Sequence, residues 1–157
     1  MHLVIPIKEL NIKNIFFLEK TKNNILNGGE FHRVLYSTDN VILNGIFLLM
    51  TLKITRCDNY FNKIKCHLEP NKNTEYIETI KKLEKSLLSE NFEVDNFEND
   101  LQITQQLESN TIKLINDFDN YDFCNNKDEI NVVLKISGIW TSGDKCGLTF
   151  RFFLTHL

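Results

Sequence analysis

The chain has 157 residues, of which 42% are hydrophobic and 25% are charged, and its formal net charge is −3. This length predicts one domain with one hydrophobic core, and the acidic balance disfavours a sequence-specific binder of duplex DNA, because such domains are usually basic. No apolar window is long enough to span a membrane, and the N-terminus shows no secretion signal. We therefore expect an intracellular protein that is neither secreted nor membrane-bound.

Residues 1–70 have the pattern of a β block. Tyr60–Leu68 predicts a strand in which alternation places Ile64, Cys66 and Leu68 on one face. Phe61, Lys63, Lys65 and His67 then share the other face, so that one aromatic ring, two lysines and a histidine follow one another in a row. Apolar and β-prone runs before it predict a short edge strand within Met1–Leu10, strands at Asn14–Glu19, Phe31–Ser37 and Val41–Thr55, and a connection at Cys57–Tyr60.

Residues 71–129 combine helical periodicity with an acidic composition. An apolar stripe predicts a helix over Thr74–Ser89, and a weaker apolar phase predicts a second helix over Asp100–Phe118. The segment carries six basic and fourteen acidic side chains, a charge of −8. Residues 1–70 carry nine basic and six acidic side chains, or +3, and residues 130–157 carry three and one, or +2. The mean charge therefore conceals two mildly basic β-rich ends.

Residues 130–157 predict a closing β-hairpin. Two runs with period-two alternation flank a turn at Ser142–Asp144, and Trp140 lies near the bend. A terminal strand this apolar must be paired and covered by the rest of the chain. The residues that we expect to face the core are Val132, Leu134 and Ile136 in the first strand and Leu148, Phe150, Phe152 and Leu154 in the second.

The order of these segments predicts an α+β fold that is mainly antiparallel β. We expect a single domain over residues 1–157, built as a small OB-like barrel or a sandwich, with a helical insertion at about 74–118 before the C-terminal β-hairpin. In the oligonucleotide-binding (OB) architecture, a five-stranded Greek-key barrel, the helix lies between the third and fourth strands. The predicted order agrees with that arrangement, although many α+β folds share it.

No motif in the sequence points to catalysis. A Gly-rich phosphate loop, H-E-x-x-H and G-x-S-x-G are all absent, and the acidic runs resemble solvated loops rather than a catalytic cleft. Cys57, Cys66, Cys124 and Cys146 lack the C-x-x-C spacing of zinc or redox sites and predict free buried thiols. We therefore expect no enzyme, no cofactor and no metal site, and an enzyme without a recognisable motif is our third alternative.

Two stripes of cations and aromatic rings point instead to single-stranded nucleic acid. Such binding requires cations that follow the phosphates and aromatic faces on which bases stack. The first stripe is Phe61, Lys63, Lys65 and His67, and the second is Thr149, Arg151 and Phe153 on the last strand. The alternative for each stripe is structural, because lysines commonly form a solvated face and Phe153 could pack under the helices.

The closing hairpin resembles the last strands of a family of single-stranded-DNA-binding proteins with an OB fold, found in phages and large DNA viruses. The shared features are the run VVLKISGIW, a turn, and Gly147-Leu148-Thr149-Phe150 leading into the final strand. The composition, with twenty Asn, seventeen Ile and no Ala, indicates an AT-rich coding genome, which agrees with a large DNA virus. The family ends in an acidic tail with a terminal aromatic residue, whereas this chain ends in FFLTHL. The resemblance implies a stacking role for Trp140 alone.

The sequence therefore predicts a non-enzymatic protein that binds single-stranded nucleic acid and comes from a large DNA virus, active in the host cytoplasm or nucleus. We expect Trp140, Phe61 and Phe153 to stack on bases, and Lys63, Lys65, Arg151 and Arg33 to neutralise phosphates. The alternative is a viral structural or host-interaction protein in which the apolar final strand and Phe-rich faces form an oligomeric β-rich interface, as in a homo-oligomer.

Overall fold

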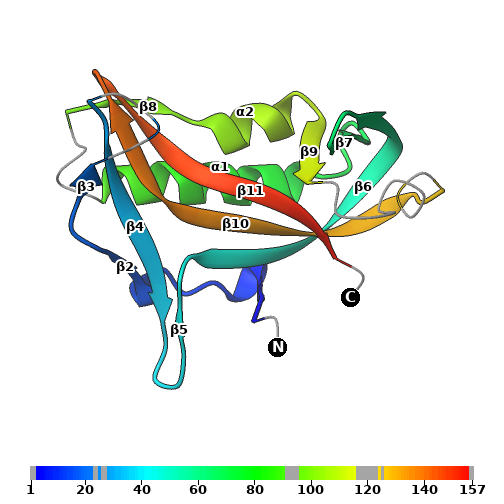
Figure 1. Ribbon diagram of the computed structural model, residues 1–157. Coiled ribbons are helices and arrows are strands. Elements are labelled where there is room, and N and C mark those ends of the chain that lie inside the picture. The colour runs from blue at the N-terminus through cyan, green and yellow to red at the C-terminus, as the bar shows by residue number, and fades with distance from the viewer. Residues whose placement is uncertain are drawn as a thin grey trace.

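The computed structural model (Figure 1) describes residues 3–22, 25, 28–90, 96–115, 124 and 126–155. Eleven strands and two α-helices have described bounds. The strands are β1 (Ile5–Pro6), β2 (Ile15–Phe17), β3 (Thr21–Lys22), β4 (Glu30–Ser37), β5 (Ile42–Leu43), β6 (Ile46–Tyr60), β7 (Lys63–Leu68), β8 (Glu98–Asp100), β9 (Thr111–Ile115), β10 (Glu129–Ser142) and β11 (Lys145–Thr155). The helices are α1 (Thr74–Ser89) and α2 (Gln102–Glu108), and two short 3-10 turns, Ile7–Glu9 and Ile12–Asn14, lie near the N-terminus.

Five strands close into a barrel in the order β6-β7-β9-β11-β10, with β10 pairing back onto β6. All neighbours in this ring are antiparallel except β9 and β11, which run parallel. Counted along the chain, the third barrel strand therefore lies beside the fifth. This closed, mainly antiparallel ring is consistent with a small OB-like barrel, and it confirms the barrel alternative of the predicted fold.

The described helices α1 and α2 lie within the insertion expected at about 74–118, before the C-terminal hairpin. In the order of the barrel strands they lie between β7 and β9, the second and third, whereas in the OB architecture the helix lies between the third and fourth strands. The bounds of α1 are those predicted. The second predicted helix, Asp100–Phe118, is wrong over Thr111–Ile115, because β9 forms there, and its last residues, 116–118, lie outside the described residues. Three of the five residues of β9 are β-branched, and buried positions alternate with more exposed ones, which favours a strand over a helix.

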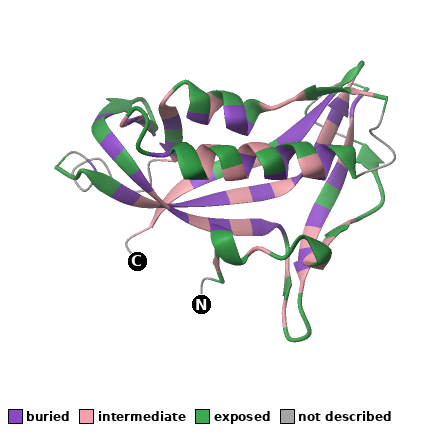
Figure 2. Cartoon of the chain, turned by 180° about the vertical axis from the view of Figure 1, so that it is seen from behind, coloured by how far each residue is buried: buried purple, intermediate pink, exposed green. Residues whose placement is uncertain are grey.

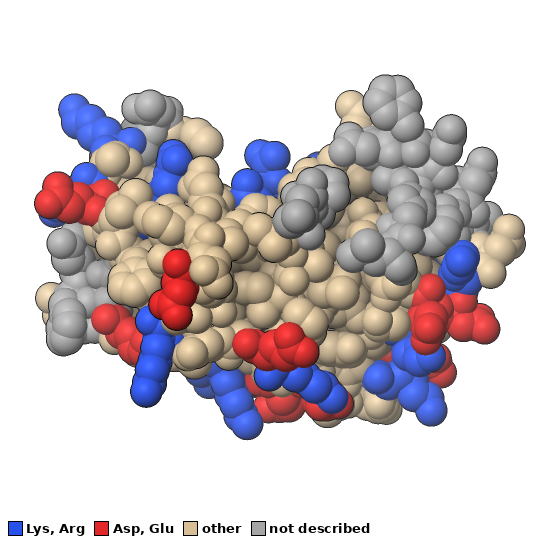
Figure 3. Space-filling model, turned by 90° about the horizontal axis from the view of Figure 1, so that it is seen from below, with Lys and Arg blue, Asp and Glu red and all other residues tan. Residues whose placement is uncertain are grey.

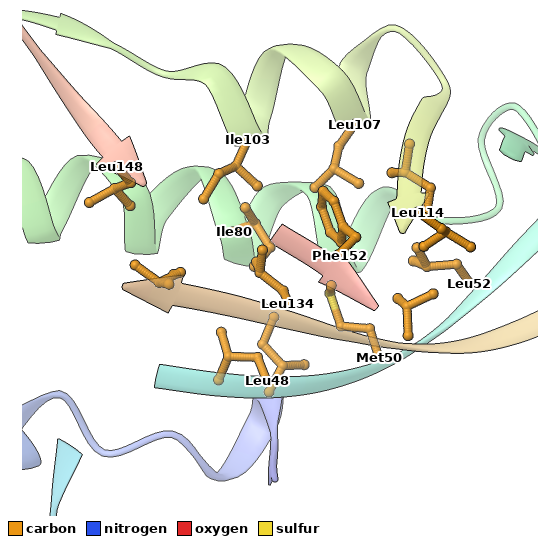
Figure 4. Packing of buried hydrophobic residues seen from close by; sticks show 14 of the residues in the cluster. Leu48, Met50, Leu52, Ile80, Ile103, Leu107, Leu114, Leu134, Leu148 and Phe152 are labelled. Carbon is orange, nitrogen blue, oxygen red and sulfur yellow. The ribbon is translucent and has the colours of Figure 1, made fainter. Parts of the chain in front are cut away.

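The inner faces of the barrel strands and the two helices enclose one core. Figure 4 shows Ile80 of α1 and Leu107 of α2 facing Leu134 and Phe152 of the closing hairpin. Leu148 and Phe152 are fully buried, and Phe150 and Leu154 pack partly buried against the same cluster, so the predicted inner face of β11 is confirmed. Figure 2 shows the alternation of buried and exposed residues along these strands and the exposed outer side of α1.

The closing hairpin is the centre of the sheet rather than an edge. β10 and β11 pair from Asn131 with Thr155 to Ser142 with Lys145, as predicted, with a register shift between Ile136 and Gly138. β11 also pairs with β8 and β9, so its outer edge is covered within the chain. Beyond the shift, β10 leaves β6 and pairs with β4.

A second small sheet region extends from β4. β2, β3 and β5 all pair antiparallel with β4, and β4 meets β10 at Gly138. A Cβ atom on Gly138 would lie 2.2 Å from the carbonyl oxygen of His32, so only glycine allows β4 to approach β10 this closely. The N-terminal edge strand is confirmed as β1, which pairs in parallel with β6.

Two buried polar side chains hold the helices in place, Asn73 by bonding to β6 and Glu84 by joining α1 to α2. The side chain of Asn73, the residue before α1, accepts a hydrogen bond from the Lys53 backbone N–H at 2.8 Å and donates one to the Lys53 carbonyl oxygen at 2.9 Å. Glu84 of α1 accepts hydrogen bonds from the backbone N–H groups of Ile103 and Thr104 and from the Thr104 hydroxyl, at 3.1, 2.9 and 2.6 Å. The first turn of α2, whose N–H groups have no partner within the helix, is thereby satisfied by a side chain of α1. Across the described part of the chain, every buried side-chain nitrogen and oxygen atom has a hydrogen-bond partner.

Candidate nucleic-acid interface

The turn between β6 and β7 presents two aromatic rings to solvent. Tyr60 is 62% exposed and Phe61 is 85% exposed, and their rings pack edge to face with centroids 4.9 Å apart. The backbone of Phe61 has a φ of 51°, a left-handed conformation that is unfavourable for a bulky L-residue. Phe61 therefore lies in a turn and not within the strand predicted over Tyr60–Leu68, and the predicted connection Cys57–Tyr60 belongs to β6.

A row of cations crosses the outer surface of four neighbouring barrel strands. Lys65 of β7 pairs in register with Lys113 of β9, and Arg151 of β11 pairs with Lys135 of β10. β9 and β11 meet at Leu114 and Phe152, so Lys113 and Arg151, one residue earlier on parallel strands, are neighbours as well. We call these residues the basic row: Lys65, Lys113, Arg151 and Lys135.

The basic row is an unfavourable arrangement for the isolated protein. Like charges directly opposite each other in an antiparallel pair destabilise a sheet, and Lys65 faces Lys113 in this way. Among the described residues, no salt bridge at 4.0 Å or less involves any member of the row. The ammonium of Lys135 lies 5.3 Å from the centroid of the Phe47 ring, a cation–π contact that leaves its charge in place. The row therefore provides positive charge that is available to an anion.

A second row beside it combines apolar and basic side chains. Tyr60 pairs with Lys63, Lys63 pairs with Ile115, and Phe153 follows Phe152 on β11 next to Ile115. We call this the mixed row: Tyr60, Lys63, Ile115 and Phe153. A pocket of about 290 Å³ lies where the two rows meet and is lined by Tyr60, Lys63, Lys65 and Lys113. An aromatic wall beside three ammonium groups is suited to a base with its phosphate.

An acidic residue lies at the edge of the basic row and is already partnered. Asp58 of β6 pairs in register with Lys65, and its carboxylate accepts a hydrogen bond from His67 Nε2 at 2.7 Å, if the ring is protonated there, with Arg56 Nε at 4.0 Å. The hydrogen bond with His67, followed by the charge of Arg56, holds the pKa of Asp58 below its usual value. His67 is therefore engaged with Asp58, and the stripe predicted with Phe61, Lys63 and Lys65 ends at this pair.

Trp140 and Arg33 lie apart from both rows. Arg33 of β4 is exposed and pairs with Gly138, two residues from Trp140. Trp140 is half-buried and pairs with Gly147, where an added Cβ would lie 2.7 Å from the indole Cζ2 atom. The ring therefore lies across Gly147 in ordinary packing. From Lys135, Trp140 is five residues further along β10, which corresponds to roughly 16 Å.

The structure thus brings together Lys63, Lys65, Arg151 and Phe153 of the predicted site, with Phe61 at one end. Sequence reasoning missed Lys113, Lys135, Tyr60 and Ile115. Lys113 and Ile115 were hidden in a segment predicted to be helical, although the alternation in TIKLI was a signal for a strand with Lys113 facing outward. Lys135 lies between Leu134 and Ile136, so the same alternation placed it on the outer face, but its position beside Arg151 depends on the strand register.

The face seen from below is less concentrated in charge. Figure 3 shows the molecule from below, with acidic and basic side chains interspersed around the margin and a largely uncharged middle. Mixed charge of this kind is common on solvated surfaces and suggests no ligand. Within the described part of the chain, neither α1 nor α2 is long and apolar enough to cross a membrane.

No protein-family model, curated protein or solved structure matches this chain. Its function therefore has to be inferred from its own residues and their geometry.

Proposed function

We propose that this protein binds single-stranded nucleic acid without catalysing a reaction, and that the basic and mixed rows are its binding surface. The observation that carries the proposal is the alignment of Lys65, Lys113 and Arg151 across three adjacent strands, beside exposed aromatic rings. In OB folds, oligonucleotides bind across the second and third strands and the loop between the first and second. The corresponding elements here are β7, β9 and the turn at Tyr60 and Phe61.

Each row has its own role in this proposal. The cations of the basic row, together with Lys63, contact phosphates and make the affinity dependent on salt. Tyr60, Phe61 and Phe153 offer faces on which bases stack, an interaction that tolerates any sequence and contributes about 1–3 kcal/mol per base. Trp140 and Arg33 lie beyond the two rows. A longer oligonucleotide that continues along β10 would reach them. The viral source indicated by the composition stays a prediction.

The test is the binding of fluorescently labelled oligo-dT, followed by anisotropy at several salt concentrations. Each phosphate contact contributes about −0.7 to the slope of log affinity against log salt, so five contacts give about −3.5 and a loss of about 130-fold between 50 and 200 mM salt. Charge reversal in the double variant Lys65→Glu/Lys113→Glu should abolish most of this affinity and reduce the slope by about two fifths.

A matched control separates the surface from the total charge. Lys82 and Lys85 are exposed on α1, away from both rows, and the double variant Lys82→Glu/Lys85→Glu changes the net charge by the same amount. It should retain nearly all of the affinity. Equal losses in the two double variants, or no binding by the natural chain at low salt, would contradict the proposal.

A second candidate is a structural or interaction protein that self-associates. It is favoured by apolar side chains exposed on the extension of β4: Phe16 is 51% exposed, Leu18 45% and Ile42 70%. Exposed apolar groups of this size can form an interface between copies. The measurement is molar mass by light scattering across a range of concentrations, for the natural chain and for Phe16→Ser/Ile42→Ser. A mass that rises with concentration only in the natural chain, without binding of oligo-dT, would favour this candidate.

A further inference from the structure

Three thiols converge directly beneath the outer rows. The sulfur atoms of Cys57 on β6, Cys66 on β7 and Cys124, which lies between β9 and β10, are all within 4.8 Å of one another. Cys57 and Cys66 pair in register, and their sulfur atoms are 2.9 Å apart. All three residues are buried. Their spacing along the chain, nine and then fifty-eight residues, gave no indication of this cluster.

We propose that Cys57, Cys66 and Cys124 bind a thiophilic d10 metal ion, with Zn²⁺ as the first candidate. Thiolates are soft ligands that select Zn²⁺ or Cu(I) over hard cations such as Mg²⁺ and Ca²⁺. Two sulfur atoms bound to one zinc at about 2.3 Å lie about 3.8 Å apart in tetrahedral geometry. The thiols therefore have to move only slightly, with Cys57 and Cys66 separating, to surround one ion.

The charge of the site favours zinc over copper. On binding, each S–H bond breaks, its electron pair stays on sulfur and forms the bond to the metal, and the proton leaves to solvent. Three thiolates with Zn²⁺ leave one net negative charge in the core, whereas three thiolates with Cu(I) leave two. Since a buried charge is costly, the divalent ion is the better match.

The thiols are poorly placed for a nucleophilic role, because all three are buried, whereas reactive cysteines are partly exposed. A metal ion replaces the thiol protons, and its bonds to the sulfur atoms offset the cost of deprotonating buried thiols.

The position of the cluster gives the metal a structural task. Cys57 precedes Asp58 and Cys66 follows Lys65, so an ion here would fix β6 and β7 under the start of the basic row. Cys124 would tie the connection between β9 and β10 to the same point. Metal binding is thus expected to stabilise the strands that carry Lys63, Lys65 and Lys113.

The experiment is the metal content and Co²⁺ spectrum of the full chain. Protein from zinc-supplemented growth, purified without chelator, should hold about one zinc per chain, and Co²⁺ added to the reduced, metal-free protein should give the intense sulfur-to-cobalt charge-transfer band of thiolate ligands. Cys124→Ser should lower the affinity for Zn²⁺ by at least about tenfold. The matched control is Cys146→Ser, which removes a buried thiol outside the cluster and should leave metal binding unchanged.

Two further measurements identify the ion and test the site if the variant does not fold. A parallel anaerobic titration with Cu(I) identifies the ion, and a preference for Cu(I) would overturn the assignment to zinc while supporting the thiolate site. If Cys124→Ser fails to fold, the natural chain still tests the proposal, because a chelator should lower its melting temperature and Zn²⁺ should restore it. No retained metal, no charge-transfer band, or a Cys57–Cys66 disulfide in the freshly isolated protein would each overturn it.

Discussion

The inner and outer faces of β7, β9 and β11 are made of alternating residues in the same strands, yet they differ in almost every physical respect. Ile64, Leu114 and Phe152 face inward, are at most 1% exposed and pack against one another and the helices. Lys65, Lys113 and Arg151 face outward and place like charges side by side. The inner face explains why the chain folds. The like charges of the outer face oppose folding rather than favour it, and we propose that this face binds an anionic ligand.

The largest expected effect belongs to the inner face. Phe152→Ala should lower the free energy of unfolding by about 3–5 kcal/mol, because it removes a fully buried ring and leaves a cavity between β11 and the helices. Urea denaturation measures the difference. The comparison variant is Phe153→Ala, one residue away on the outer face, which should cost much less stability and should weaken binding of oligo-dT. Equal destabilisation by the two variants would show that the outer face belongs to the core.

The second-largest loss of stability is expected when the contacts that join the helices are removed. Glu84→Ala leaves the Ile103 and Thr104 donors at the start of α2 without their buried partner, so we expect a loss of about 2 kcal/mol in the free energy of unfolding. Urea denaturation at neutral pH provides the value. A loss below about 0.5 kcal/mol would mean that water replaces the carboxylate at little cost.

Glu84 also predicts a pH dependence. Burial raises the pKa of Glu84 in the folded chain above its value in the unfolded chain, with the hydrogen bonds from Thr104 and Ile103 opposing this shift. The folded chain therefore binds the proton more tightly, and the contribution of Glu84 to stability is greatest below the unfolded pKa and is lost as the pH rises through the folded pKa. Glu84→Gln cannot titrate, so the natural chain should lose stability relative to this variant over that window. A constant difference between them at every pH would contradict the raised pKa.

The closing hairpin shows how much of the fold the sequence could predict. Leu148, Phe150, Phe152 and Leu154 alternate strictly, and the turn at Gly143 is local, so β10 and β11 follow from neighbouring residues alone. The same reasoning predicted the bounds of α1. It failed at Thr111–Ile115, where five residues were too few to outweigh a weak helical phase across a longer window.

The candidate site was only half predictable for a different reason. Lys63, Lys65, Arg151 and Phe153 were found because each follows an alternating pattern within its own strand. The position of Lys113 beside both Lys65 and Arg151 depends on the register of three strands that are distant in sequence. The thiols of Cys57, Cys66 and Cys124 converge for the same reason. Such contacts arise from the order and register of strands that are distant in sequence, so local residue patterns do not predict them.

A change in stability of intermediate size is expected at Phe61, in the turn between β6 and β7. Phe61→Gly should raise the free energy of unfolding by about 1 kcal/mol, because glycine adopts the left-handed conformation of this position without steric cost. It should also weaken oligo-dT binding by removing a stacking ring. Phe61→Ala is the control, since it removes the ring but keeps the unfavourable backbone. If both variants are equally stable, the turn is relaxed, and if both bind as well as the natural chain, Phe61 does not stack.

The substitution with the smallest expected change in stability gives the sharpest test of the difference between the inner and outer faces. Lys113→Glu places a carboxylate opposite Lys65 and beside Arg151, so it converts a repulsive cross-strand pair into an attractive one. We expect a gain of about 0.5 kcal/mol in the free energy of unfolding at low salt, which added salt should diminish. The same variant should bind oligo-dT more weakly, because a phosphate contact is lost and a negative charge now lies in the row. Few substitutions are expected to improve folding and impair binding together. A variant that loses stability, or that gains stability while binding oligo-dT as tightly as before, would show that the basic row is an ordinary solvated face.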